Sequence, residues 1–211
     1  MRSAIVLVGG AARRAGGREK YFFTFQGQTF IDRLIGTLRE VVDEIVVVAR
    51  DPGQCERFCH LGDIRCIPDV RRGLGPIGGL HAGALAVHGE CIFVAACDMP
   101  CINPEVVRLL FDAVDDYDAA IPCWNADMLE PLHAVYRRSA LLTYLEEHES
   151  LSLRAMVRSL NTRYVGVERI RKIDPDLLTF TNINNLEDLK TIDPSAECDG
   201  GSACGPGEEP S

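Results

Sequence analysis

The sequence has no long apolar run and no excess of basic residues, and both absences exclude classes of protein. No stretch approaches the roughly 18 consecutive apolar residues that a membrane-spanning helix requires. The N-terminus lacks the ordered basic, apolar and small-residue parts of a signal peptide, so we expect a cytoplasmic location. The net charge of −9 over 211 residues argues against a surface that binds nucleic acid.

A disulfide framework and a zinc site are also missing from the cysteine pattern. The nine cysteines are odd in number, and some of them, such as Cys66, lie inside apolar segments. The spacings Cys55/Cys59 and Cys97/Cys101 have neither a second matching pair nor a nearby histidine pair. We therefore interpret the cysteines as small residues of the core.

What the chain does have is a regular alternation of apolar runs and helix-length segments. We expect strands at Ser3–Val8, Glu44–Ala49, Ile64–Ile67, Cys91–Ala96, Asp118–Pro122, Leu132–Tyr136 and Arg163–Val167. We expect helices at Phe30–Val42, Gly78–Val87, Pro104–Val114, Arg138–His148, Leu151–Leu160 and Asn184–Thr191. Strands that are apolar throughout are typical of a parallel sheet covered on both faces. The pattern therefore predicts an α/β fold with a mostly parallel central sheet.

The C-terminal residues differ in composition from the rest of the chain. Ser195–Ser211 consists largely of Gly, Pro, Ser and acidic residues, without Leu, Ile, Val or an aromatic residue. Such a segment buries too little apolar surface to offset the entropy of ordering. We expect one folded domain at 1–192 and a disordered acidic tail at 193–211.

A glycine-rich basic segment, Leu7–Phe22, directly follows the first predicted strand. Ligands of parallel sheets bind beyond the carboxyl ends of the strands, and glycine lets backbone N–H groups approach phosphate oxygens. Arg14 and Lys20 add charge-assisted contacts to this loop. The Gly-Lys-Ser/Thr sequence of a Walker A loop is missing. The segment predicts a site for a small phosphorylated anion, the alternative being a surface loop.

Asp98 follows the fourth predicted strand, in the sequence Cys97-Asp98-Met99-Pro100. A carboxylate at a buried strand end is well placed to hold Mg²⁺, which proteins bind through one or two carboxylates together with substrate phosphates. The alternative is a turn residue, which the following proline also favours.

The stretch Gly73–Gly78 matches the G-x-G-x-x-G pattern of dinucleotide-binding proteins. Several residues separate it from the preceding strand, however, whereas that pattern requires a tight strand–turn–helix. Pro76 also restricts Gly75. We interpret the glycines as a loop lining a base or ribose, with a nicotinamide site as the alternative.

Several segments together resemble one known family. They are Leu7-Val8-Gly9-Gly10 with Arg14, Gly16 and Lys20; Pro68-Asp69 with Gly75-Pro76-Ile77-Gly78-Gly79; Cys97-Asp98-Met99-Pro100; Pro131-Leu132-His133-Ala134-Val135-Tyr136-Arg137; and Phe180-Thr181-Asn182-Ile183-Asn184-Asn185-Leu186-Glu187-Asp188-Leu189. This set resembles the molybdenum cofactor guanylyltransferases, which are nucleotidyltransferases with a three-layer Rossmann-like fold. One departure is Ala49-Arg50-Asp51, where the family often has Asn after the second strand.

The resemblance implies a nucleotidyltransferase domain at 1–192 that transfers GMP from GTP to the molybdopterin cofactor and releases pyrophosphate. It implies Arg14, Lys20 and Asp98 as catalytic residues, with Asp98 holding Mg²⁺. The nucleotide-binding residues it implies are Leu7, Val8, Gly9, Gly10, Lys20, Asp69, Gly75, Gly78 and Asp98. Candidate acceptor-side residues are His133, Tyr136, Asn182 and Asn184, whose alternative roles are structural.

Other functions stay open at this point. The base transferred could be cytosine, or the acceptor could be another molecule, such as a phosphorylated small acid. An NAD-binding oxidoreductase would use Gly73–Gly78, and a non-catalytic nucleotide-binding protein could act in molybdoenzyme maturation. Lys20 and Asp98 together argue against that last alternative, because a binding protein does not need the metal carboxylate. Maturation proteins of molybdoenzymes are further candidate partners.

Overall fold

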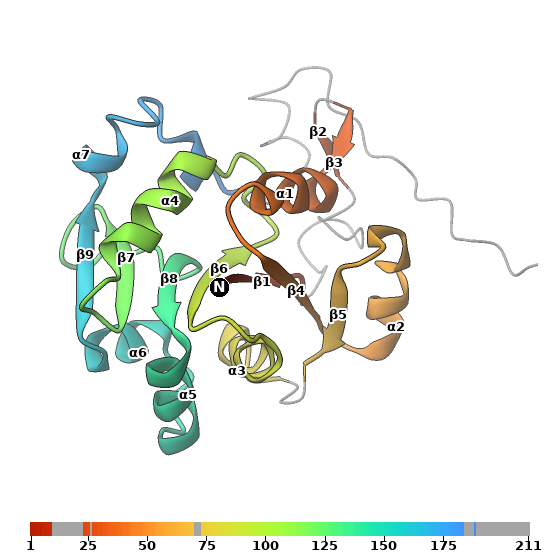
Figure 1. Cartoon of the computed structure of the whole chain (residues 1–211), viewed down its shortest axis with the longest axis horizontal. Helices are drawn as coiled ribbons and strands as arrows, with labels where there is room; N and C mark the ends of the chain where they lie inside the picture. The colour runs from red at the N-terminus through yellow and green to blue at the C-terminus, as the bar shows by residue number, and fades with distance from the viewer. Residues whose placement is uncertain (10–22, 26, 70–72, 184–187, 189–211) are drawn as a thin grey trace, which may run out of the picture.

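The computed structural model describes residues 1–9, 23–25, 27–69, 73–183 and 188. Its centre is a seven-stranded sheet in the order β5-β4-β1-β6-β8-β7-β9 (Figure 1). The strands are β1 (Arg2–Leu7), β4 (Glu44–Ala49), β5 (Arg65–Pro68), β6 (Cys91–Ala96), β7 (Ala119–Cys123), β8 (His133–Arg137) and β9 (Thr162–Gly166). Only β8 runs antiparallel to its neighbours in this sheet. The prediction of a mostly parallel sheet is therefore confirmed.

Helices cover both faces of the sheet, which gives three layers (Figure 1). The α-helices are α1 (Phe30–Arg39), α2 (Pro52–Glu56), α3 (Pro76–Ala86), α4 (Pro104–Ala113), α5 (Arg138–Glu147), α6 (Leu153–Ser159) and α7 (Val167–Ile170). α1 and α4 pack on one face, while α3, α5 and α6 pack on the other. No helix in the described ranges combines the length and apolar composition needed to cross a membrane.

The central strands are apolar throughout because each contributes to both cores. In β1, Ala4 and Val6 belong to the core under α1 and α4, while Ile5 belongs to the core over α3. All three side chains are fully buried. Alternate residues of a strand point to opposite faces, so a sheet between two helical layers needs apolar residues at every position.

Two helix starts follow from their local sequence. The Thr29 hydroxyl accepts a hydrogen bond from the Asp32 N–H at 3.2 Å and caps α1. The Asn103 side chain accepts one from the Glu105 N–H at 2.9 Å and caps α4, with proline at the first helical position. These caps satisfy backbone donors that have no partner within the helix.

Short elements are where the structure differs from the sequence-based expectation. The hairpin β2 (Thr24–Phe25) and β3 (Gln28–Thr29), the helices α2 and α7, and two 3₁₀ turns at Cys59–Leu61 and Leu178–Phe180 were not predicted. They are too short for hydrophobic periodicity to reveal them. The predicted helix at 184–191 and the predicted tail at 193–211 lie outside the described residues, except for residue 188.

Candidate functional site

The carboxyl ends of four parallel strands meet at one edge of the sheet, which we call the carboxyl edge. Three backbone hydrogen bonds join residues there: Val8 N–H to the Val48 carbonyl at 3.0 Å, Asp69 N–H to the Ala49 carbonyl at 2.7 Å, and Cys97 N–H to the Leu7 carbonyl at 3.2 Å. The structure thus brings the ends of β1, β4, β5 and β6 together, with Asp69 and Asp98 both at this edge.

Gly9 follows the end of β1 and lies close to the end of β4. A Cβ atom added at Gly9 would lie 3.4 Å from the Arg50 nitrogen and 3.6 Å from its Cα. Both neighbours are backbone atoms at van der Waals distance, so the end of β1 packs directly against the chain that leaves β4. Gly10, Arg14 and Lys20, which the sequence places in the same loop, lie outside the described residues.

Gln54 joins the ends of β1 and β4, a role that sequence reasoning missed. It lies in α2 and is only 2% exposed. Its Oε1 accepts a hydrogen bond from the Arg50 N–H at 2.6 Å, and its Nε2 donates to the Val8 carbonyl at 3.4 Å. The Asp51 carboxylate caps α2 by accepting the Gln54 N–H at 2.8 Å. One buried amide therefore fixes the backbone just before the glycine-rich loop.

The Gly73–Gly78 segment lies where α3 begins, after the loop that follows β5. Gly75 has a φ of 62° and precedes Pro76, the first residue of α3. A left-handed residue at this point favours glycine, because other residues are strained there. The helix begins inside the glycine pattern and well after β5, which does not fit the tight strand–turn–helix of a dinucleotide fingerprint. Gly78 is buried within α3.

Asp98 is partly buried between β6 and α4, and its Oδ1 is shielded from solvent. Its backbone carbonyl accepts a hydrogen bond from the Ile183 N–H at 2.8 Å. This bond brings the C-terminal segment against the end of β6. Within the described ranges, no group of three or more His, Cys, Asp or Glu side chains could hold a metal ion. Mg²⁺ is commonly held by one or two carboxylates together with substrate phosphates and water, an arrangement compatible with a single carboxylate here.

His133 lies at the start of β8, beside the carboxyl edge, and is fully buried. Its Nε2 lies 3.2 Å from the Thr179 hydroxyl, and its ring makes edge contacts with Phe93 and Phe180 at 5.1 Å each. Burial lowers the pKa of His133 from 6.5 to about 3, so the ring is neutral at physiological pH. Its contacts hold the 3₁₀ turn at Leu178–Phe180 against the sheet.

The other acceptor-side candidates are placed differently. Tyr136 is fully buried in the core on the opposite face, and its hydroxyl donates to the Pro131 carbonyl at 2.7 Å. Burial raises the pKa of Tyr136, which favours a structural role. Asn182 is exposed and precedes Ile183, so it lies beside the Asp98 loop. Asn184 lies outside the described residues.

A second feature missed from the sequence is an aromatic group near the carboxyl edge. Trp124 follows β7, and its indole N–H donates to Glu130 Oε1 at 3.0 Å. The Trp124 ring contacts the edge of Phe180 at 5.8 Å, and Phe180 in turn contacts His133. Residues far apart in sequence form this group, so no local spacing predicts it.

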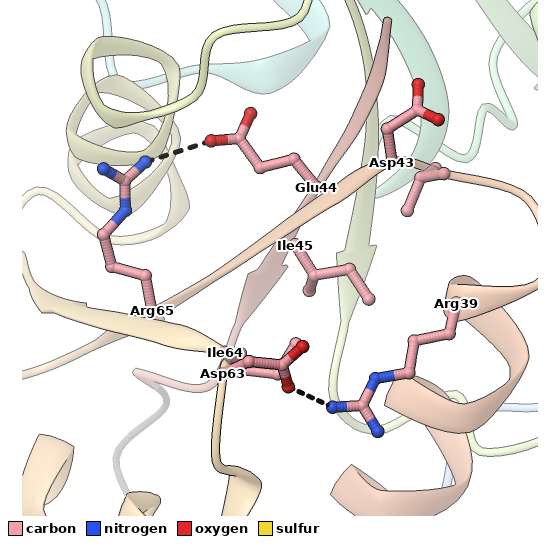
Figure 2. A pocket seen from close by; sticks show the side chains of 8 residues that line it. Arg39, Asp43, Glu44, Ile45, Asp63, Ile64 and Arg65 are labelled. Atoms are coloured by element: carbon pink, nitrogen blue, oxygen red, sulfur yellow. Dashed lines mark hydrogen bonds and ion pairs between the residues drawn. The ribbon is translucent and has the colours of Figure 1, made fainter.

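A pocket of about 240 Å³ lies at the opposite edge, where β4 and β5 begin (Figure 2). Arg39 pairs there with Asp63 at 2.6 Å, and Arg65 pairs with Glu44 at 3.2 Å. Because β4 and β5 run in parallel, this pocket is separated from Asp69 and Asp98 by the length of the strands. It is therefore not part of the candidate site.

Comparisons with known proteins agree with the fold. Residues 4–164 match a family described as the MobA-like NTP transferase domain. The chain is 43% identical over 202 residues to a probable molybdenum cofactor guanylyltransferase of Methanosarcina acetivorans, with 90% of this chain and 89% of the relative covered. It is 33% identical to a molybdenum cofactor guanylyltransferase of Desulfosudis oleivorans, over 89% and 92% of the two chains.

Solved structures show the same similarity. The crystal structure of molybdopterin-guanine dinucleotide biosynthesis protein A from Archaeoglobus fulgidus superposes with a TM-score of 0.76 at 36% identity, covering 90% of this chain and 96% of that one. A nucleotidyl transferase from Methanothermobacter gives a TM-score of 0.73 at 22% identity, covering 91% and 95%, which supports the fold alone.

Proposed function

Because the chain belongs to the MobA-like NTP transferase family and is a nucleotidyltransferase, we propose that it is a molybdenum cofactor guanylyltransferase. It would transfer GMP from GTP to the molybdopterin cofactor and release pyrophosphate. The observation that carries this proposal is the 43% identity to a probable enzyme of this activity over 90% of the chain. The geometry of the carboxyl edge supports this proposal, because the ends of β1, β4, β5 and β6 meet there together with Asp69 and Asp98.

The reaction is a displacement at phosphorus that needs no protein nucleophile. An oxygen of the acceptor's terminal phosphate attacks the α-phosphorus of GTP, and the bond from the α-phosphorus to the bridging oxygen of the β-phosphate breaks. Pyrophosphate leaves with that oxygen and its bonding electrons. The protein's contribution is to align the two substrates and to neutralise charge.

The glycine-rich loop supplies the triphosphate side of the site in this proposal. Backbone N–H groups around Gly9 and Gly10 would hold phosphate oxygens, because glycine leaves no side chain in the way. Arg14 and Lys20 would neutralise the negative charge that grows on the pyrophosphate as it leaves. The Gln54 bonds to Val8 and Arg50 fix the direction in which this loop departs from the sheet.

Asp98 is the residue we assign to the metal. A carboxylate at the end of β6, partly buried and outside any cluster of metal ligands among the described residues, fits a Mg²⁺ ion that takes its remaining ligands from phosphates and water. Bound Mg²⁺ would neutralise phosphate charge and orient the reacting groups. The Ile183 hydrogen bond holds the backbone that carries this carboxylate.

Asp69 and the start of α3 form the nucleoside side of the site in this proposal. A carboxylate can accept hydrogen bonds from the ring N–H and amine of guanine, or from a ribose hydroxyl. Adenine lacks that pair of donors, and cytosine is smaller than a purine. Sites built to pair such donors reject analogues that lack them, because buried polar groups would then stay unpaired.

A thermal-shift panel with GTP, CTP, ATP and NAD⁺, each with and without Mg²⁺, tests this proposal. Binding to the native state raises the melting temperature by an amount that increases with ligand concentration and with affinity. We expect the largest increase with GTP, and a further increase when Mg²⁺ is present. The largest shift with NAD⁺ would overturn the nucleotidyltransferase site, and the largest shift with CTP would overturn the choice of guanine.

A further inference from the structure

The loop between β7 and β8 presents the only tryptophan of the chain near the carboxyl edge. Trp124 is 38% exposed and follows directly after β7. Its backbone N–H bonds to the Met128 carbonyl at 2.9 Å, which closes a tight turn. Arg154 of α6 donates to the Asp127 carbonyl at 2.7 Å and holds the turn from outside. The indole is therefore positioned by its loop as well as by its own side-chain bond.

Glu130 places a carboxylate beside this indole. Its Oε1 accepts the Trp124 indole N–H at 3.0 Å, and among the described residues no other donor reaches the carboxylate. Partial burial raises the pKa of Glu130, and the indole hydrogen bond only partly offsets this effect. A half-buried carboxylate with one protein donor has further acceptor positions, which a ligand with two adjacent N–H groups would fill.

The indole and Asp98 are linked through the closing segment of the chain. Phe180 contacts the Trp124 ring, and Ile183, three positions later, bonds to the Asp98 carbonyl. Three residues span at most about 11 Å, so Phe180, which the indole contacts, lies on the same short segment as the residue bonded to Asp98. In the sheet, β7 lies two strands from β6, which at about 4.8 Å per strand separates their ends by roughly 10 Å, a distance that a ring system joined to a phosphate can bridge.

The sheet order places this group on the far side of Asp98 from the nucleoside side. Asp69 follows β5 and Trp124 follows β7, with β4, β1, β6 and β8 between these strands. At about 4.8 Å per strand, the ends of β5 and β7 are separated by roughly 24 Å. One guanine cannot contact both, so the two sides have room for different rings.

We propose that Trp124 and Glu130 form the docking surface for the pterin ring of the acceptor. The flat ring would stack on the exposed part of the indole, as nucleic-acid bases stack on aromatic side chains. The Glu130 carboxylate would accept the ring N–H and the exocyclic amine that lie side by side on a pterin. This proposal rests on the proposed function, because that function supplies a pterin as the acceptor.

Trp124 fluorescence tests the proposal without any turnover, since no other tryptophan contributes to the signal. The probes are free pterin, which has the amine beside the ring N–H, and lumazine, in which a carbonyl replaces that amine. We expect saturable quenching of Trp124 by pterin, with lumazine binding several-fold more weakly. Glu130→Gln keeps an oxygen that can accept the indole N–H, and should weaken pterin binding about tenfold while reducing the preference over lumazine.

The control is Glu149→Gln, which removes an exposed carboxylate near the end of α5 and should leave both titrations unchanged. Melting temperatures of both variants establish that they are folded. Quenching that does not saturate, quenching stronger with GTP than with pterin, or an equal effect of the two substitutions would each overturn the docking surface.

Measurements of KM for each substrate distinguish a failure of this docking surface from a failure of the proposed function. In a protein that transfers GMP, Glu130→Gln and Trp124→Leu should raise KM for molybdopterin and leave KM for GTP unchanged, with Trp124→Phe closer to the wild type. Unchanged acceptor KM in both variants would overturn the docking surface while the proposed function stands. Saturable pterin binding in a protein that transfers no GMP would overturn the function and support the surface.

Discussion

The Ile183 N–H donates a hydrogen bond of 2.8 Å to the backbone carbonyl of Asp98, which joins the closing motif of the chain to the end of β6. Residues far apart in the sequence thereby fix the loop that follows β6 and carries Asp98. The bond involves the backbone, so this contact does not depend on the charge of the Asp98 side chain. A substitution at Asp98 can therefore test chemistry separately from folding.

Asp98→Asn should leave the melting temperature nearly unchanged and lower Mg²⁺-dependent turnover by at least ~100-fold, the scale for removing one pre-organised electrostatic contributor. The amide keeps the shape of the side chain and removes its charge. Turnover is measured across a Mg²⁺ titration. Turnover near that of the wild type would remove Asp98 from the metal site.

Gln54→Ala should weaken GTP binding as well as stability. The substitution removes the acceptor of the part-buried Arg50 N–H and the donor to the buried Val8 carbonyl. An unsatisfied buried group costs about 1–3 kcal/mol, which chemical denaturation would detect. Gln28→Ala on β3 is the control, because that side chain is exposed. Equal GTP affinity in Gln54→Ala and the wild type would show that the bridge is purely structural.

Alanine substitutions at two helical glycines, one packed against the sheet and one facing open space, test how closely α3 packs on β1. A Cβ at Gly83 in α3 would lie 2.7 Å from the Cγ2 atom of the buried Ile5, whereas a Cβ at Gly36 in α1 meets nothing within 4 Å. Gly83→Ala should destabilise the fold by about 1–3 kcal/mol through overpacking. Gly36→Ala should stabilise it by about 0.5–1 kcal/mol, the helix preference of alanine over glycine. The opposite order of unfolding free energies would contradict the packing of α3 on β1.

Glu44 should contribute a pH-dependent part of the stability. Its burial opposes ionisation, but hydrogen bonds from the His88 N–H and the Ser3 hydroxyl outweigh that effect and lower its pKa from 4.5 to about 2. A lowered pKa stabilises the fold above pH 4.5, and that contribution is lost as the pH falls towards 2. The unfolding free energies of the wild type and Glu44→Gln should therefore converge over this range. A constant difference between them would contradict the shift.

The main architecture was predictable because its signals are local. Glu44–Ala49 and Cys91–Ala96 were predicted with the bounds that β4 and β6 have, since strands between two helical layers are apolar at every position. The short hairpin β2–β3 gave no such signal, because two residues per strand establish no periodicity. Asp69 and Asp98 could be placed at one edge because carboxyl ends of parallel strands meet there.

The rest of the site depends on contacts between distant residues. Gln54 bonds to Val8 only because β1 and β4 are neighbours, and Trp124 meets Phe180 only because the chain returns after β9. The burial of Tyr136 also follows from the face of β8 on which it lies. Residue types and spacing alone do not contain these relationships.

The most direct test of the central claim is transfer of labelled GMP from GTP to molybdopterin by the purified protein, with CTP and ATP in parallel reactions. In the presence of Mg²⁺ and acceptor, we predict formation of molybdopterin guanine dinucleotide. Pyrophosphate should be released in an amount equal to this product. GTP should be used much faster than either other nucleotide. Faster transfer from CTP, or pyrophosphate release without any labelled molybdopterin product, would contradict the assignment as a molybdenum cofactor guanylyltransferase.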